Sequence, residues 1–268
     1  EAMRLGMETK KPQADAGPMV TNGEWLSTLL ANLKKPDSIR SAVLPRSFCA
    51  QLRPYQKSGY TWLAYMDKLG FGACLADDMG LGKTVQVLAY LEKLRSAKKN
   101  ARALLIVPAS LLGNWRKETE RFAPELTYQI LHGKKAAALE EQLAESQVFL
   151  TVTTYGLAMR LKPLQERQWD CVILDEAQAI KNPLTKQTRE IKKLPARMRI
   201  AMTGTPIEND LTNLWSLFDF LNKGLLGTSQ EFRAYCSGLS DNPEGYARLK
   251  EMVSPFLLRR MKTDKRVI

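Results

Sequence analysis

One short stretch combines glycines, a lysine and a threonine in a spacing that suits phosphate binding: residues 76–84 read Ala-Asp-Asp-Met-Gly-Leu-Gly-Lys-Thr. The stretch follows a short apolar run and precedes a helical pattern, so a tight turn there points several backbone N–H groups into one concavity. Lys83 can then reach the β- and γ-phosphates of a nucleotide, and the Thr84 hydroxyl can ligate Mg²⁺. We interpret the stretch as a P-loop rather than a chance glycine-rich turn, with Asp77 in place of the usual first glycine.

Two adjacent carboxylates form a second stretch. Asp175 and Glu176 follow the apolar run 171–174, which is typical of a buried parallel strand. Since open α/β sheets bind ligands at the carboxyl ends of strands, Asp175 is expected to hold Mg²⁺, directly or through water, and Glu176 to polarise the attacking water. A solvated acidic helix start would give the same local pattern. Together with the P-loop, the pair favours ATP hydrolysis.

A third stretch, residues 202–209, reads Met-Thr-Gly-Thr-Pro-Ile-Glu-Asn after an apolar strand. Thr203, Gly204 and Thr205 are expected at the same edge of the sheet as the acidic pair. Their hydroxyls could hydrogen-bond the carboxylates and sense the γ-phosphate. Taken alone, the stretch is equally typical of an ordinary loop.

Composition limits the classes of function. The 268 residues carry 40 Lys and Arg against 28 Asp and Glu, a net charge of +12 that fits a polyanionic partner such as nucleic acid, although charge alone does not exclude a merely basic protein. The single histidine, His132, has no partner cluster, which argues against zinc. The four cysteines are widely spaced and are expected to be reduced packing residues: Cys49, Cys74, Cys171 and Cys236.

The hydrophobic pattern alternates strands and helices, which predicts βαβ units and a mostly parallel sheet with helices on both faces, an α/β P-loop fold. Residues 1–20 are expected to form a flexible extension and residues 21–50 a helical lead-in, with Trp25 and Leu29 on its apolar face. Helices are also expected at 57–68, 85–94, 111–122, 136–144, 155–161, 185–191, 211–221, 229–235 and 246–253. Strands are expected at 72–76, 103–107, 127–131, 148–153, 171–174 and 199–202.

In this order, the motifs resemble the N-terminal RecA-like lobe of superfamily-2 helicases and, more closely, Swi/Snf-type double-stranded DNA translocases, with a pattern nearest to bacterial members. The resemblance covers residues 50–266. The closer match lies in the runs 52–56 (Leu-Arg-Pro-Tyr-Gln), 77–84, 111–115 (Leu-Leu-Gly-Asn-Trp), 180–183 (Ile-Lys-Asn-Pro), 211–217 (Leu-Thr-Asn-Leu-Trp-Ser-Leu) and 256–260 (Phe-Leu-Leu-Arg-Arg).

The resemblance implies roles for individual residues. Gln56 would read the adenine edge, beside the phosphate-binding residues Asp78, Met79, Gly80, Leu81, Gly82, Lys83 and Thr84. Gln178, where many members have His, would join the catalytic set of Lys83, Asp175 and Glu176. The coupling loop beside the acidic pair would consist of Thr203, Gly204 and Thr205. Contacts to DNA phosphates are implied for Ser110, Asn114, Trp115, Thr153, Thr154, Tyr155 and Lys181.

Arg259 and Arg260 have three possible roles: contacts with DNA, contacts between lobes, or part of a solvated basic tail. Trp115 and Lys181 also have plainer alternatives, as a core residue and a solvated loop residue.

The resemblance also implies a partner that this chain lacks, a second RecA-like lobe of the same protein with an arginine finger. We therefore expect a fragment of a longer protein, with the ATP-binding lobe at residues 51–222 and a helical extension at 223–268 leading towards the missing lobe. An arginine finger accounts for roughly 10³–10⁵ in rate, so the fragment alone is expected to be nearly inactive.

Three functions compete at this stage: a double-stranded DNA translocase, a strand-separating or RNA-dependent helicase, and a degenerate ATP-binding switch. The absence of an evident strand-splitting wedge favours the first over the second, and the intact Lys83, Thr84, Asp175 and Glu176 argue against the third. No apolar run approaches a membrane span, and no signal peptide is evident. The expected location is on DNA, in the bacterial cytoplasm or, in a eukaryote, the nucleus.

Overall fold

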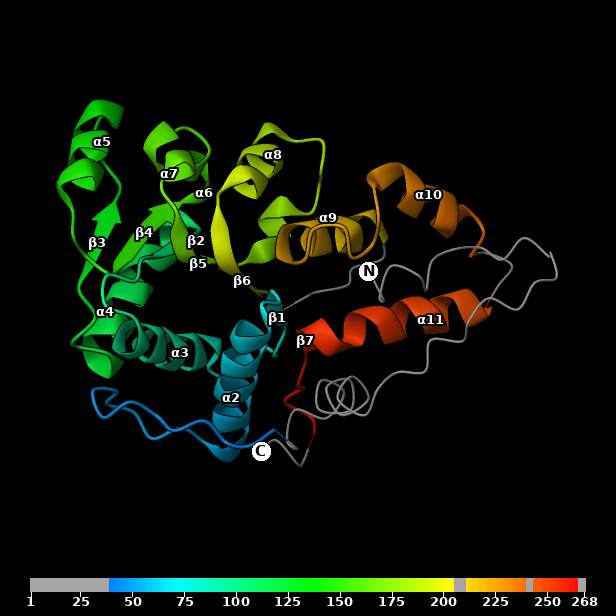
Figure 1. Cartoon of the computed structure of the whole chain (residues 1–268), viewed down its shortest axis with the longest axis horizontal. Helices are drawn as coiled ribbons and strands as arrows, with labels where there is room; N and C mark the ends of the chain where they lie inside the picture. The colour runs from blue at the N-terminus through cyan, green and yellow to red at the C-terminus, as the bar shows by residue number, and fades with distance from the viewer. Residues whose placement is uncertain (1–38, 205–210, 240–242, 265–268) are drawn as a thin grey trace.

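The computed structural model describes residues 39–204, 211–239 and 243–264, and its central feature is one parallel β-sheet (Figure 1). Among these residues the sheet has seven strands in the order β3-β4-β2-β5-β6-β1-β7, and every pairing is parallel. The strands are β1 (Ala73–Leu75), β2 (Ala103–Val107), β3 (Tyr128–Leu131), β4 (Leu150–Thr154), β5 (Trp169–Leu174), β6 (Ala196–Met202) and β7 (Leu257–Leu258). This confirms the predicted α/β class.

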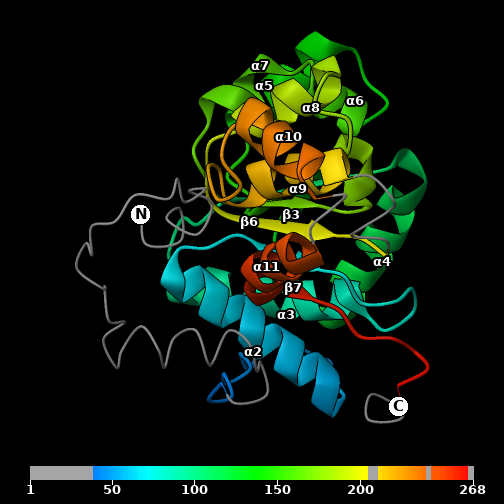
Figure 2. The same cartoon turned by 90° about the vertical axis from the view of Figure 1, so that its right-hand side faces the viewer.

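Helices cover both faces of the sheet, as Figures 1 and 2 show. One face carries α2 (Pro54–Leu69), α3 (Lys83–Ala97), α4 (Leu112–Phe122) and, beside them, α11 (Pro243–Val253). The other face carries α5 (Ala136–Glu145), α6 (Tyr155–Ala158), α7 (Lys162–Glu166), α8 (Lys186–Lys193), α9 (Leu211–Leu221) and α10 (Ser229–Ser237). Short 3₁₀ turns lie at η3 (Ala109–Leu111), η4 (Ala177–Ile180) and η5 (Ser254–Phe256).

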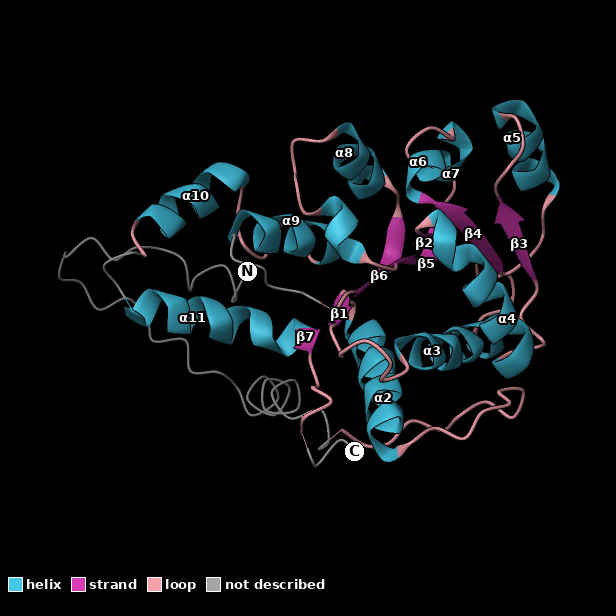
Figure 3. Ribbon diagram, turned by 180° about the vertical axis from the view of Figure 1, so that it is seen from behind, coloured by secondary structure: helices cyan, strands magenta, loops and turns pink. Residues whose placement is uncertain are grey.

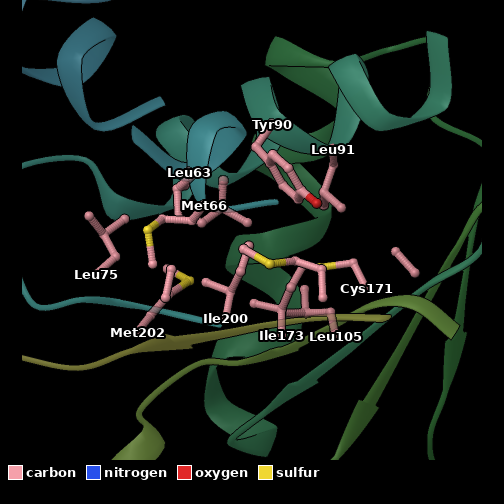
Figure 4. Close-up of a cluster of buried hydrophobic side chains, with 14 of the residues drawn as sticks. Leu63, Met66, Leu75, Tyr90, Leu91, Leu105, Cys171, Ile173, Ile200 and Met202 are labelled. Atoms are coloured by element: carbon pink, nitrogen blue, oxygen red, sulfur yellow. The ribbon is translucent and has the colours of Figure 1, made fainter. Parts of the chain in front are cut away.

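The sheet separates two hydrophobic cores. On the α2–α3 face, Leu63 and Met66 of α2 and Leu91 of α3 pack over Ile173 and Ile200 of the central strands (Figure 4). The second core lies beneath α5–α9. All residues of β2 and β5 are buried, as expected for strands covered on both faces by helices. A rigid, doubly covered sheet therefore supports the loops at its carboxyl edge.

The boundaries of α2 follow from local chemistry. Pro54 opens the helix, and the Gln56 carboxamide accepts a hydrogen bond from the Arg53 N–H at 2.9 Å, which satisfies a free donor at the helix start. Gly70, at φ 75°, ends the helix in the left-handed conformation. Residues 39–50, which precede α2 in the chain, contain no helix. The Tyr60 hydroxyl of α2 donates a hydrogen bond to the Val43 carbonyl of this segment at 2.7 Å.

The lead-in and the C-terminal part differ most from the sequence-based expectations. We expected a helical lead-in at residues 21–50. Residues 21–38 lie outside the described residues, and residues 39–50 are not helical. Strand β7 and helix α7 were not predicted. Strand β7 returns the chain to the sheet beside β1, with Cys74 opposite Leu257 and Leu75 opposite Leu258 (Figure 3 shows the two strands from behind). The boundary at residue 222 remains a prediction.

None of the helices within the described ranges is long and apolar enough to cross a membrane.

The return of the chain through β7 predicts that the C-terminal segment contributes to folding stability. Phe256 is fully buried and meets the Phe71 ring edge-on, with the centroids 5.2 Å apart. Phe256→Ala should lower the free energy of unfolding by about 3–5 kcal/mol, because it leaves a cavity between α2, β1 and α11. Urea denaturation followed by circular dichroism measures the change.

The control is Met261→Ala, five residues on and half exposed. It should change the free energy of unfolding by no more than about 0.5 kcal/mol. Equal small effects of both substitutions would show that the segment docks without stabilising the fold.

Candidate nucleotide-binding site

The glycine-rich loop joins β1 to α3, as the sequence predicted. Gly80 and Gly82 adopt φ of 83° and 78°, a region that side-chain-bearing residues avoid, so the tight turn requires both glycines. Helix α3 begins with Lys83, and Thr84 is its second residue. The free N–H groups of that first turn therefore face the concavity of the loop.

The Lys83 ammonium folds back over its own loop. Its Nζ donates a hydrogen bond of 2.6 Å to the backbone carbonyl of Asp77. The lysine is only partly buried, so a bound phosphate could take the place of that carbonyl.

Gln56 lies against the loop from the α2 side. Its Nε2 donates to the Leu81 carbonyl at 3.2 Å, and a Cβ on Gly82 would come within 2.5 Å of the same nitrogen. The glycine at this position is thus required both by backbone conformation and by the approach of the amide. The structure places Gln56 beside the phosphate loop, and its contact with adenine remains a prediction.

The acidic pair lies at the carboxyl end of β5. Asp175 is 7% exposed, and its carboxylate accepts hydrogen bonds from the Trp115 indole N–H at 2.7 Å and from the Glu176 N–H at 3.0 Å. Burial raises the pKa of Asp175, and the neighbouring Glu176 charge adds to the rise, whereas the Trp115 bond and the Lys83 charge oppose it. The Lys83 charge therefore acts on Asp175, but burial outweighs it and the pKa of the acid stays raised.

A side-chain relay connects the acidic pair to the end of β6. The Gln178 amide donates to Glu176 Oε2 at 2.7 Å, and its Oε1 accepts from the Thr203 hydroxyl at 3.1 Å. The Thr203 N–H in turn donates to the Leu75 carbonyl of β1, immediately before the P-loop. Gln178 thus bridges two of the predicted motifs. Gly204 is described and adjoins the relay, whereas Thr205 lies outside the described residues.

Three of the residues predicted to contact DNA have buried side chains with partners inside the fold, and their contacts with DNA remain predictions. Trp115 is fully buried and uses its N–H on Asp175. Thr153 is fully buried and donates to the Leu131 carbonyl at 3.1 Å. The Tyr155 hydroxyl donates to the Asp175 carbonyl at 2.7 Å, so that ring holds the backbone of the acidic pair. Ser110, Asn114 and Lys181 are exposed and Thr154 is half-buried, so these four remain candidates for DNA contacts.

Glu118 is a residue that the sequence reasoning missed. Its carboxylate is half-buried, and burial is the main reason that its pKa is raised, with Asp175 contributing. The Asn114 amide donates to Glu118 at 3.2 Å, and both Asn114 and Thr84 counteract the rise in its pKa. Glu118 lies three residues after Trp115, so the helical period alone would have placed the two on one face of α4.

Arg260 has a partner that the sequence did not predict, the carboxylate of Asp77. It forms a salt bridge with Asp77 in which the two side chains are 12% and 0% exposed. The solvated-tail interpretation of Arg260 is therefore wrong, since its guanidinium lies under the phosphate loop.

Comparison with known proteins gives a consistent assignment. The model of the SNF2-related domain matches residues 55–266. YwqA of Bacillus subtilis (strain 168), a candidate ATP-dependent helicase/translocase by name, is 40% identical over 260 residues, covering 95% of this chain and 28% of that protein. The TATA-binding protein-associated factor MOT1 of Saccharomyces cerevisiae is 33% identical, covering 92% of this chain and 15% of its own length. This chain thus spans less than a third of the length of each of these relatives.

The Sulfolobus solfataricus SWI2/SNF2 ATPase core, solved in complex with double-stranded DNA, is similar to this chain in structure as well as sequence. The TM-score is 0.78 with 41% identity, over 84% of this chain and 47% of that one.

The raised pKa of Asp175 predicts how stability depends on pH. In the unfolded chain the carboxyl titrates near 3.8, and in the fold it titrates higher, so the folded chain binds more protons between the two values. Stability from this group is complete below the unfolded pKa and is lost as pH rises through the folded pKa. Asp175→Asn does not titrate, so its stability relative to wild type should increase over that window and then level off.

Urea unfolding between pH 4 and 8, without nucleotide or Mg²⁺, measures the difference. Glu141→Gln, which replaces an exposed carboxylate on α5, serves as the control and should follow wild type. A difference for Asp175→Asn that stays constant with pH would contradict the assignment.

Proposed function

The chain belongs to the SNF2-related domain family, and on that premise we propose that it is the ATP-binding motor lobe of a double-stranded DNA translocase. The observation that carries the proposal is the convergence of Lys83, Asp175 and Thr203 at the carboxyl ends of the neighbouring strands β1, β5 and β6. Parallel sheets bind their ligands at this edge.

The residues have distinct roles in this proposal. Lys83 exchanges the Asp77 carbonyl for the β- and γ-phosphates of ATP. Glu176 polarises the attacking water once its bond with Gln178 is released or turned, and Gln178 transmits that change to Thr203. Tyr155 fixes the backbone from which both carboxylates project. Use of ATP is the property that the family implies; the roles of the residues are our inference.

The oxygen donors near the P-loop suit Mg²⁺, which prefers carboxylate, hydroxyl, phosphate and water oxygens. We assign Thr84 and Asp175 as the residues that hold it, with the carboxylate of Glu118 beside the Thr84 hydroxyl. Bound Mg²⁺ would neutralise charge on the β- and γ-phosphates. The geometry of Asp175 supports this assignment, because its buried carboxylate accepts hydrogen bonds from an indole and a backbone N–H but has no salt-bridge partner among the described residues, so a cation would offset its burial.

DNA is proposed as the polyanionic partner. The net charge of +12 supports it, and so does the exposure of Ser110, Asn114 and Lys181 near the ends of β2 and β5. Hydroxyl, amide and ammonium groups bind phosphates without reading bases, so the binding should not depend on sequence. The similar Sulfolobus core was solved with double-stranded DNA, which favours duplex over single strands or RNA.

We also propose that a second RecA-like lobe completes the ATP site. The chain covers about half of the Sulfolobus core, and it offers no residue positioned as an arginine finger in the part that the structure describes. The single lobe should then bind ATP but hydrolyse it very slowly, with stimulation by DNA only when both lobes are present.

The nucleotide site is tested by two substitutions. Lys83→Ala should abolish measurable binding of a fluorescent ATP analogue, because the phosphates lose their nearest cation. Glu176→Gln should bind the analogue like wild type, yet in the two-lobe protein it should reduce phosphate release by about 10²–10⁴-fold, the range for losing a general base.

Lys99→Ala, at the opposite edge of the sheet before β2, is the control and should leave both measurements unchanged. Normal turnover by Glu176→Gln would show that another group polarises the water.

The DNA proposal predicts a salt-dependent, sequence-independent interaction. The affinity of the chain for a duplex, measured by fluorescence anisotropy, should fall linearly with the logarithm of the salt concentration. Lys181→Ala should weaken binding and reduce the salt slope by about 1, whereas Lys99→Ala should not. A second duplex of unrelated sequence should bind equally well; strong discrimination between the two would overturn the proposed backbone contacts.

A further inference from the structure

The segment that follows β7 runs along the P-loop strand as a continuation of the sheet. The Ala76 N–H donates to the Leu258 carbonyl at 2.7 Å, and the Asp78 N–H donates to the Arg260 carbonyl at 3.0 Å. The Asp78 carboxylate then accepts from the Lys262 N–H at 2.9 Å. Five residues of the C-terminal segment, 258–262, are thus fastened to residues 76–78 of the loop (Figure 1 shows β7 beside β1).

Arg260 inserts its side chain beneath the loop. Its Nε donates to Asp77 Oδ1 at 2.8 Å, and its Nη2 donates to Asp77 Oδ2, so the pair is bidentate. The Gln86 amide of α3 donates to the same carboxylate at 3.2 Å, while Gln86 Oε1 accepts from Arg260 at 2.8 Å. Asp77 and Gln86 are both 0% exposed. The carboxylate is therefore completely enclosed and fully bonded.

The same guanidinium also reaches the helix that carries Gln56. Its Nη1 donates to the Tyr55 carbonyl, and its carbon lies 5.3 Å from the centre of the Tyr55 ring. Tyr55 immediately precedes Gln56, which contacts the loop at the Leu81 carbonyl. Arg260 therefore connects three parts of the candidate nucleotide site: the start of α2, the loop, and helix α3.

Asp77 joins this cluster to the P-loop lysine. Its carboxylate is held by Arg260, while its carbonyl holds the Lys83 ammonium at 2.6 Å. The backbone carbonyl of residue 77 thus fixes the position of the Lys83 ammonium before a phosphate binds. A glycine at this position, as in the usual P-loop pattern, would offer Arg260 no carboxylate, leaving it only the Tyr55 carbonyl and the Gln86 amide oxygen.

We propose that Arg260 is a positioning residue for nucleotide binding, which holds the P-loop in its binding shape through Asp77 and so couples the C-terminal segment to the nucleotide. The inference rests on the proposed function, since it assigns the loop to ATP. Because coupling between sites is reciprocal, bound nucleotide must also stabilise the docking of residues 258–262.

The main test is Arg260→Lys, which keeps the positive charge but loses the bidentate geometry. The dissociation constant for a fluorescent ATP analogue with Mg²⁺ should rise about tenfold or more, the effect typical of removing groups that orient binding residues. Arg248→Lys, an exposed arginine on α11, is the matched control and should stay within about twofold of wild type. Circular dichroism and thermal unfolding confirm that each variant is folded.

A double-mutant cycle provides the second measurement. Arg260→Gln alone leaves the buried Asp77 charge without its salt-bridge partner, which destabilises the fold, so it is compared with Asp77→Asn/Arg260→Gln, which removes both charges. Where all variants fold, the nucleotide affinity of the double variant should match that of Asp77→Asn within about twofold, because Arg260 acts through Asp77. Where Arg260→Gln does not fold, the comparison of Asp77→Asn with the double variant gives the same answer.

Hydrogen exchange provides the third measurement and does not depend on substitutions. The amides of Asp78 and Lys262, which form the ladder, should exchange more slowly when a non-hydrolysable ATP analogue and Mg²⁺ are added.

The outcomes separate this inference from the proposed function. If wild type binds no nucleotide, both fail. If wild type binds, Lys83→Ala does not, and Arg260→Lys binds like wild type, the proposed function stands and Arg260 only stabilises the fold. A loss of affinity in Arg260→Lys at normal thermal stability, together with slower exchange on nucleotide addition, supports the inference.

Discussion

The arrangement of this site depends on one constraint: two carboxylates, those of Asp77 and Asp175, are buried at the carboxyl edge of an apolar sheet. A buried charge is strongly unfavourable unless it is paired and hydrogen-bonded. Asp77 receives a guanidinium in bidentate geometry together with an amide. Among the described residues, Asp175 receives an indole N–H and a backbone N–H, and Lys83, whose charge lowers its pKa, forms no salt bridge with it. Asp77 therefore has a cation as its salt-bridge partner, and Asp175 has none among the described residues.

On the proposed function, that difference separates a structural acid from a functional one. The Asp77–Arg260 pair fastens the last strand to the first and fixes the loop between them. The raised pKa of Asp175 shows that its surroundings favour the neutral form, so a cation that arrives with the nucleotide would relieve an existing electrostatic penalty. Trp115 orients this acid without supplying charge. An arginine in its place would neutralise Asp175 and weaken its attraction for Mg²⁺.

Local sequence patterns predicted the elements well because the strands and loops that bind phosphate have short-range signals. The apolar run before Asp175, the glycines before Lys83 and the helical period of 211–221 each specify structure within a few residues. The sequence did not predict β7, which has two residues and pairs with a strand about 180 positions earlier. It left Trp115 open between a DNA contact and a core residue, and Arg260 open among three roles, because burial of a long side chain depends on which distant element covers it.

Helix α4 shows which structural features the sequence can predict and which depend on the tertiary fold. Its outer face exposes Asn114, and its inner face carries Trp115 and Glu118, which approach Asp175 and Thr84. Asn114 also donates to Glu118, so a single hydrogen bond links the exposed face to the acidic one. A helical-period argument distinguishes these faces, but only the position of α4 over the sheet shows that the inner face meets the nucleotide site.

Each candidate functional group of the site is bonded to a partner from the chain itself. Lys83 bonds the Asp77 carbonyl, Glu176 bonds Gln178, and Asp175 bonds Trp115. Buried polar groups without partners would destabilise the fold, so this internal bonding permits a stable free state. It also means that ATP must replace existing bonds rather than fill vacant ones, and only the difference between old and new bonds contributes to affinity. On the proposed function, a single lobe contacts the nucleotide from one side and gains little from that exchange. A second surface that closes over the phosphates would supply the larger gain, and this is our physical argument for the second lobe that we propose.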